Sequence, residues 1–77
     1  MQKPPSAWEQ ELQECRMQSW HALHAWRAAR SYFDEVSEPA LVDEAIYQME
    51  AARSRYHYYV ARVQELERQP PLSSTSL

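Results

Sequence analysis

Glycine is absent from the 77 residues of this chain, and its absence excludes several kinds of site at once. Gly-rich phosphate loops, the glycine fingerprint of dinucleotide-binding folds and the calcium loops of EF-hands all require it. Tight hairpin turns between strands also depend on glycine, which argues against a sheet of short strands. Proline lies only near the edges of two long stretches, and both stretches can therefore form helix. The five prolines are Pro4, Pro5, Pro39, Pro70 and Pro71.

Cysteine and long apolar runs are also scarce. The single cysteine, Cys15, permits no internal disulfide and no cysteine-based metal cage. No apolar run approaches the ~18 residues that a membrane-spanning helix needs. The first residues lack the apolar segment of a signal peptide, so we expect a cytoplasmic chain. The net charge of −3 argues against the overall basic character of many nucleic-acid-binding proteins, but it leaves room for a local basic patch.

Two heptad patterns dominate what is present. In each, apolar or small residues recur at alternating steps of three and four, and a helix with such a pattern needs another helix to cover it. The sequence therefore predicts an all-α fold, an antiparallel two-helix hairpin of the coiled-coil type. The core-facing positions are Trp8, Leu12, Cys15, Ser19, Ala22, Trp26, Ala29, Phe33 and Val36 in the first stretch, and Val42, Ala45, Met49, Ala52, Tyr56, Tyr59, Val63 and Leu66 in the second.

Capping signals give the expected boundaries. Ser6 and Glu9 have the spacing of a capping box, and Pro39 suits the first turn of a helix. We predict a flexible lead over residues 1–5, a hairpin over 6–69 and a disordered tail over 70–77. Within the hairpin, helices are expected at 7–33 and 39–68, with a turn at 34–38. Because glycine is absent, Asp34 is the best candidate for a left-handed residue at the end of the first helix.

One antiparallel register places every core position opposite another core position. Most of its layers pair a large side chain with a small one, which close packing favours. Two separate stretches of sequence thus agree on a single register, and this agreement supports the hairpin. The layers are Leu12–Leu66, Cys15–Val63, Ser19–Tyr59, Ala22–Tyr56, Trp26–Ala52, Ala29–Met49 and Phe33–Ala45.

A second stripe of residues flanks the core positions on one side of the predicted hairpin. A lone hairpin leaves this stripe uncovered, and a core this small contributes only about 3–5 kcal/mol of net stability. We therefore expect a homodimer that forms a four-helix bundle, or an unidentified protein partner in its place. The stripe comprises Arg16, Trp20, Leu23, Arg27, Arg30, Ile46, Arg53, His57 and Val60; further candidate contacts are Asp43, Arg55, Tyr56 and Tyr47, the last alone on an outer face.

The middle of each helix is rich in arginine and free of acidic residues. Arginines beside exposed aromatic rings are typical of surfaces that bind single-stranded nucleic acid, through phosphate charge and base stacking. The preference of acidic residues for helix starts explains the same distribution without any ligand. Nucleic-acid binding is therefore the alternative to a protein–protein interaction. The aromatic and histidine residues of this belt are Trp20, His21, His24, Tyr32, His57 and Tyr58.

No pattern in the sequence predicts an enzyme, a cofactor or a metal site. The Glu-x-x-His spacing of di-iron bundles is absent. His21 and His24 point away from the predicted core and lack a third ligand, so we interpret them as solvated. Cys15 occupies an apolar layer, which is more typical of a core residue than of a nucleophile. We expect no small-molecule substrate and no membrane association.

Three segments resemble a known family. They are Phe33-Asp34, Leu41-Val42-Asp43-Glu44-Ala45-Ile46-Tyr47 and Ala51-Ala52-Arg53-Ser54-Arg55-Tyr56-His57-Tyr58-Tyr59. Together they look like the YaaL-like family of small bacterial proteins from spore-forming Firmicutes, a domain of unknown function. The resemblance covers roughly residues 12–67. It implies a small helical cytosolic protein with no assigned activity or cofactor, and it transfers no catalytic residue.

Overall fold

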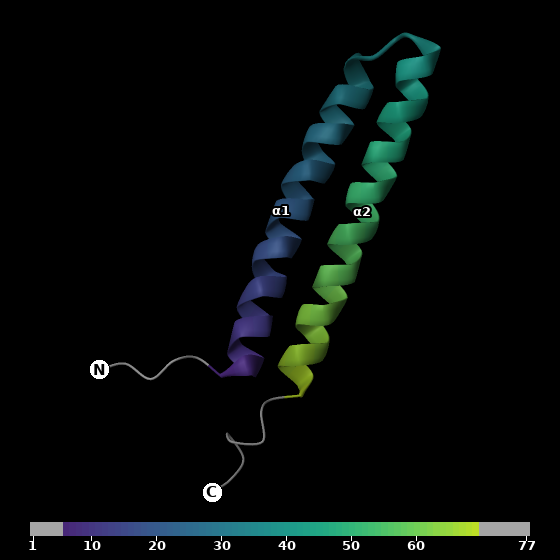
Figure 1. Ribbon diagram of the computed structural model, residues 1–77. Coiled ribbons are helices and arrows are strands. Elements are labelled where there is room, and N and C mark those ends of the chain that lie inside the picture. The colour runs from purple at the N-terminus through teal and green to yellow at the C-terminus, as the bar shows by residue number, and fades with distance from the viewer. Residues whose placement is uncertain (1–5, 70–77) are drawn as a thin grey trace, which may run out of the picture.

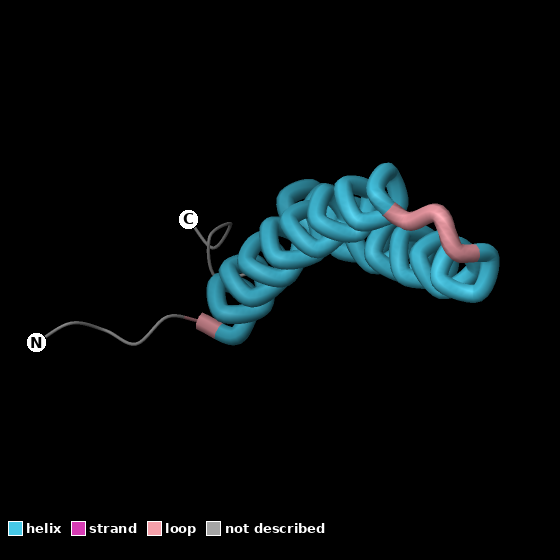
Figure 2. The backbone as a smooth tube through the Cα atoms, turned by 90° about the horizontal axis from the view of Figure 1, so that it is seen from above, coloured by secondary structure: helices cyan, strands magenta, loops and turns pink. Residues whose placement is uncertain are grey.

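The computed structural model describes residues 6–69, which form two long α-helices joined by a short turn. Helix α1 spans Ala7–Glu35 and helix α2 spans Pro39–Arg68. They lie side by side and antiparallel, with the turn at one end (Figure 1). Seen from above, the two rods cross in projection (Figure 2). The predicted all-α hairpin is confirmed, whereas the predicted flexible lead and disordered tail lie outside the described residues.

Helix α1 begins with the predicted capping box. The Ser6 hydroxyl accepts a hydrogen bond from the Glu9 backbone N–H at 3.2 Å, and a Glu9 carboxylate oxygen accepts one from the Ser6 N–H at 3.1 Å. Two N–H groups that lack partners within the helix are thereby satisfied. Helix α2 begins at Pro39, as predicted, after the cap residue Glu38, whose side chain makes no capping hydrogen bond.

The turn is shorter than predicted. Helix α1 continues to Glu35, so the reversal uses residues 36–38 and not 34–38. The prediction of a left-handed Asp34 is wrong, because Asp34 is helical and no residue from 6 to 69 has a positive φ. Val36 ends the helix in an extended conformation, with φ −82° and ψ 137°, and its N–H donates to the Tyr32 carbonyl at 3.1 Å. A β-branched residue favours that conformation, and the chain therefore reverses without glycine.

The core is thin. Its buried residues all come from the predicted core positions, but most are small. Large core-facing side chains such as Trp26 and Phe33 remain half-buried, because each helix of a two-helix hairpin is covered from one side only. The polar core position Ser19 is satisfied locally, since its hydroxyl donates to the Arg16 carbonyl at 2.8 Å. The buried residues are Leu12, Cys15, Ala22, Ala45, Ala52 and Leu66.

The packing agrees with the predicted register at the end of the hairpin opposite the turn. Leu12, Cys15 and Leu66 form one buried cluster, with Val63 among the side chains packed against it. The layers Leu12–Leu66 and Cys15–Val63 therefore come together as expected.

The predicted layer of Trp26 on Ala52 holds less well. The Trp26 ring centroid lies 5.8 Å from the Tyr56 ring and 6.0 Å from the His57 ring, one turn beyond Ala52. Side chains lean toward the start of their own helix, so Trp26 and Tyr56 lean toward each other across an antiparallel pair. The two rings thus contact each other between adjacent layers, while Ala52, the predicted neighbour of Trp26, is still buried.

Candidate interaction surface

The two edges of the predicted stripe meet on one side of the hairpin. Arg16 of α1 forms an ion pair with Glu67 of α2 at 2.6 Å. Leu23 and Arg30 follow Arg16 at seven-residue intervals, and Val60, Arg53 and Ile46 precede Glu67 at the same intervals. Residues seven apart lie on nearly the same side of a helix, so both sets face the same way. We call this side the Trp20 face: Arg16, Trp20, Leu23, Arg27, Arg30, Ile46, Arg53, His57 and Val60.

The apolar part of the Trp20 face is open to solvent. Trp20 is 60% exposed and Ile46 is 40% exposed, while Leu23 and Val60 are half-buried. The indole of Trp20 contacts the His24 ring edge-on, with centroids 4.1 Å apart, one turn along the same helix. Tryptophan is enriched at protein interfaces because its large apolar surface contributes strongly once it is covered.

Two arginines of the Trp20 face lack an acidic partner. Arg16 pairs with Glu67, and Arg53 lies 3.5 Å from Glu50. Arg27 and Arg30 form no ion pair with any residue from 6 to 69. With Leu23 and Trp26 they line a hollow of about 140 Å³. This part of the face therefore combines apolar side chains with unpaired positive charge.

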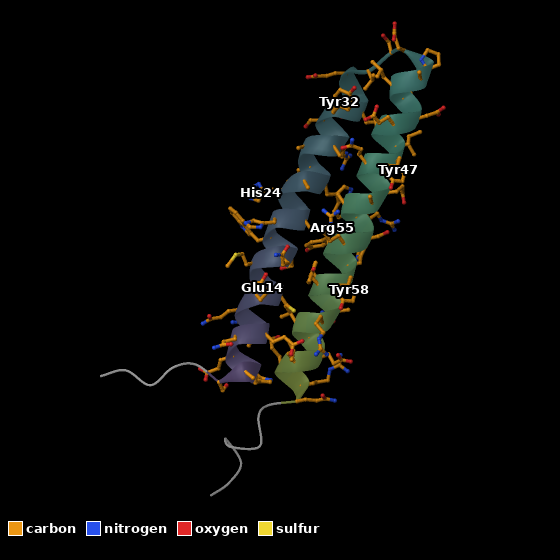
Figure 3. All side chains as sticks on the ribbon, in the orientation of Figure 1. Glu14, His24, Tyr32, Tyr47, Arg55 and Tyr58 are labelled. Atoms are coloured by element: carbon orange, nitrogen blue, oxygen red, sulfur yellow. The ribbon has the colours of Figure 1, made fainter. Side chains whose placement is uncertain are left out.

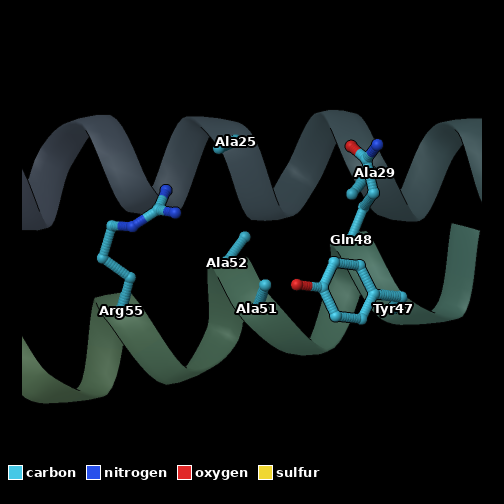
Figure 4. Close-up of a pocket in the computed structure, with 7 residues that line it drawn as sticks. All are labelled: Ala25, Ala29, Tyr47, Gln48, Ala51, Ala52 and Arg55. Carbon is cyan, nitrogen blue, oxygen red and sulfur yellow. The ribbon is translucent and has the colours of Figure 1, made fainter. Parts of the chain in front are cut away.

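The candidate contacts Tyr47 and Arg55 lie on the opposite side. They line a second hollow, of about 260 Å³, between the two helices (Figure 4). The Arg55 side chain reaches from α2 toward α1 and forms no ion pair with a described residue (Figures 3 and 4). Tyr47 is 73% exposed, which agrees with a position on an outer face, and its side chain also lines the hollow. The other lining residues are Ala25, Ala29, Gln48, Ala51 and Ala52.

Asp34 and Asp43 extend the Trp20 face toward the turn, since Asp34 follows Arg27 by seven residues and Asp43 precedes Ile46 by three. Asp43 is exposed in α2 near the turn, and Tyr56 is half-buried against Trp26. The residues of the arginine and aromatic belt are distributed around the hairpin. His24 projects from the side of α1 that faces away from α2 (Figure 3), while the 62% exposed Tyr58 packs edge-on against Tyr59 at 5.0 Å. The described residues therefore do not gather the belt into one groove.

Features that would indicate chemistry are few in the described part of the chain. No three His, Cys, Asp or Glu side chains between residues 6 and 69 come close enough together to hold a metal ion. Neither helix has an apolar stretch of the length that crossing a membrane demands. The Cys15 thiol is buried, and this burial raises its pKa above the ordinary value of 9.0, with a further contribution from the charge of Glu11. A raised pKa disfavours the reactive thiolate.

Sequence reasoning missed the polar contacts that join the helices near the termini. Arg62 of α2 donates to the Glu11 carboxylate of α1 at 2.7 and 3.1 Å and also contacts Glu65. These hydrogen bonds, first that to Glu11, raise the pKa of the Arg62 guanidinium. The Trp8 indole N–H donates to the Leu66 carbonyl at 2.9 Å. Glu11 and Arg62 each directly precede a core position, Leu12 and Val63, and their opposite charges were the available signal.

No family model, curated protein or solved structure matches this chain. The likeness to the YaaL-like family therefore stays a prediction. Function must be inferred from the geometry of the Trp20 face and of the hollow on the opposite side.

Proposed function

We propose that this chain is a non-enzymatic interaction module of the cytoplasm that docks a helical partner on its Trp20 face. The observation that carries the proposal is the exposure of Trp20 and Ile46 on the same side as the unpaired Arg27 and Arg30. A partner helix on this face would complete a bundle around a hairpin whose own buried core is small. The chain then acts either as a dimer or as an accessory subunit of another protein.

The energetic reason is the area that such a partner would cover. A tryptophan side chain can bury about 150–250 Å², and Trp20 is 60% exposed in the hairpin. At about 25 cal/mol per Å², covering roughly 100–150 Å² of indole contributes about 2.5–4 kcal/mol. That contribution is comparable to the whole net stability expected of so small a core. Docking on this face therefore stabilises the hairpin as well as the complex.

Photo-cross-linking in living cells tests the proposal directly. A photo-reactive amino acid at position 20 should form a covalent adduct with a protein, whether a second copy or another chain. The matched control is position 17, because Met17 is a similarly exposed apolar residue of α1 that lies outside the Trp20 face. Equal adduct formation at both positions, or none at position 20, would contradict the proposal.

Binding of single-stranded nucleic acid is the second candidate. It is favoured by three arginines without an acidic partner among the described residues, Arg27, Arg30 and Arg55. Phosphate contacts of this kind make affinity fall steeply as salt rises. The test is fluorescence anisotropy with labelled single-stranded DNA and RNA at low salt. A flat titration eliminates this candidate, whereas binding that weakens in Arg27→Gln would support it.

A further inference from the structure

We infer that the partner on the Trp20 face is a second copy of this chain, docked antiparallel. The inference rests on the proposed function, because it names the occupant of the same face. Two copies that meet face to face around a two-fold axis have two arrangements, parallel and antiparallel. Each arrangement brings different charges together, and the positions of the charged residues on this face distinguish them.

The parallel arrangement sets like charges against like. In this arrangement the two-fold axis runs parallel to the helices, and α1 of one copy packs on α2 of the other. Residues that lie opposite each other within one hairpin are then also opposite each other between the two copies. Asp34 then lies beside Asp43 of the second copy at the turn end, so two carboxylates oppose each other. Opposed like charges disfavour a contact and are a usual means of rejecting a wrong arrangement.

In the antiparallel arrangement the two-fold axis runs across the helices, so α1 packs on α1 and α2 packs on α2. The axis then lies halfway between any two residues of the same helix that contact each other in the dimer. Pairing Arg16 with Asp34 of the second copy puts the axis at residue 25 of α1, halfway between them. Pairing Trp20 with Arg30 gives the same midpoint. These pairs bring a second carboxylate to Arg16, which already pairs with Glu67, and a guanidinium to the exposed indole, where it gains a cation–π contact.

Helix α2 locates the axis independently. Its two apolar residues on this face, Ile46 and Val60, contact each other across the axis if that axis lies at Arg53, halfway between them. The register that sets Trp26 opposite Ala52 also sets Ala25 level with Arg53. Pairs from both helices therefore agree on a single two-fold axis.

The size of the contact suits a stable dimer. With this axis the copies overlap over about 20 residues of α1 and nearly all of α2, or roughly 30 and 40 Å. Each helix is about 10 Å wide, so the flat footprint is roughly 700 Å² per copy. Accessible area exceeds a flat footprint, and a standard interface buries about 800 Å² per partner. Leu23 then faces the aliphatic stem of Arg27 of the second copy, so their hollow is also covered.

The arrangement has one unfavourable contact, which makes it testable. Arg53 lies on the axis, beside Arg53 of the second copy. Arg53→Gln should therefore lower the dissociation constant of the dimer in sedimentation equilibrium. Arg55→Gln, on the opposite side, should leave it unchanged. Trp20→Ala should raise it by about thirtyfold, as expected for a tryptophan at the centre of an interface.

Disulfide trapping in the full-length chain tests the axis itself. In a Cys15→Ala background, Arg53→Cys should form an intermolecular disulfide under mild oxidation, because the introduced cysteine lies beside the same cysteine of the second copy. Arg55→Cys in the same background is the matched control and should form no intermolecular disulfide, so that it runs as a monomer on a non-reducing denaturing gel. Circular dichroism establishes that both variants keep their helices. The dissociation constant of Arg53→Gln, which retains Cys15, tests the position of the axis independently of the disulfide.

The outcomes separate this inference from the proposed function. A monomeric chain whose position 20 cross-links to a different protein overturns the second copy but supports the Trp20 face. A dimer that Trp20→Ala leaves intact overturns both. A dimer that depends on Trp20 but is not trapped through Arg53→Cys overturns the antiparallel axis alone.

Discussion

The half of the hairpin near the termini and the half near the turn are built differently. The terminal half, residues 6–20 and 58–69, holds the cross-helix hydrogen bonds and ion pairs that the structure records: Trp8 with Leu66, Arg16 with Glu67 and Arg62 with Glu11. It also holds the buried cluster of Leu12, Cys15 and Leu66. The turn half, residues 21–57, buries Ala22, Ala45 and Ala52, and its larger side chains remain partly exposed.

The difference separates stability from recognition. In the terminal half, charges of opposite sign neutralise one another within the chain. In the turn half, Arg27, Arg30 and Arg55 have no acidic partner among the described residues, and they line hollows on both sides. Groups left without partners inside a folded chain are the ones available to another molecule. We therefore expect substitutions in the buried cluster and the cross-helix contacts of the terminal half to change unfolding, and those of exposed residues on the Trp20 face to change association.

The largest expected effect comes from the terminal cluster. Leu12→Ala removes a buried leucine side chain and should lower the free energy of unfolding by about 2–3 kcal/mol. Ile46→Ala, in the turn half, removes a 40% exposed side chain and should cost less than about 1 kcal/mol. Urea unfolding followed by far-UV circular dichroism measures both. Equal losses would show that the two halves do not differ in stability.

The two central tryptophans provide the second comparison. Trp26 is half-buried against Tyr56 and His57, so Trp26→Ala should destabilise the hairpin by about 2–3 kcal/mol. Trp20 contacts His21 and His24 of its own helix, and Trp20→Ala should change the unfolding of a dilute sample by less than about 0.5 kcal/mol. The same variant should weaken association. If both variants lose equal helicity, the distinction between core and Trp20 face is wrong.

The hairpin was predictable from sequence because its determinants are local or periodic. The capping box depends on Ser6 and Glu9, three residues apart, and the core follows from heptad spacing along each helix. The same spacing, together with the register between the helices, also predicts that Arg16 and Ile46 lie on the same side of the hairpin.

The details that failed depend on geometry that the pattern does not contain. Heptad spacing gives the level of Trp26 but not the lean of its ring toward Tyr56. The turn was misjudged at Asp34 because a helix can end at an extended residue such as Val36, with no left-handed conformation at all. The hollow beside Tyr47 was not predicted, because it depends on the small size of the alanines on both helices. Such features emerge only when side chains from both helices are placed together.

The third prediction concerns the hydrogen bond between the helices at the terminal end. Trp8→Phe keeps an aromatic ring but removes the indole N–H that donates to the Leu66 carbonyl at 2.9 Å. The bond is partly buried, so its loss should lower the free energy of unfolding by about 1 kcal/mol. Thermal and urea unfolding provide the measurement, and hydrogen exchange should show faster opening near Leu66. Unchanged stability would mean that water replaces the indole without cost.

The smallest expected effect comes from the exposed ion pair on the same end. Glu11→Gln removes the charge that Arg62 pairs with across the helices, while Arg62 keeps its contact with Glu65 on its own helix. Exposed pairs contribute little, because solvent and salt screen them. We expect a loss of stability smaller than that of Trp8→Phe, and one that disappears at high salt.

The matched control is Glu14→Gln. The Glu14 carboxylate accepts a hydrogen bond from Gln18 of the same helix, so this variant removes a negative charge from α1 without breaking a contact between the helices. A loss in Glu11→Gln alone, seen at low salt, would assign the effect to the cross-helix pair. A loss that persisted at high salt would contradict that assignment, because screening would then have no effect on it, and the terminal half would owe its stability to packing alone.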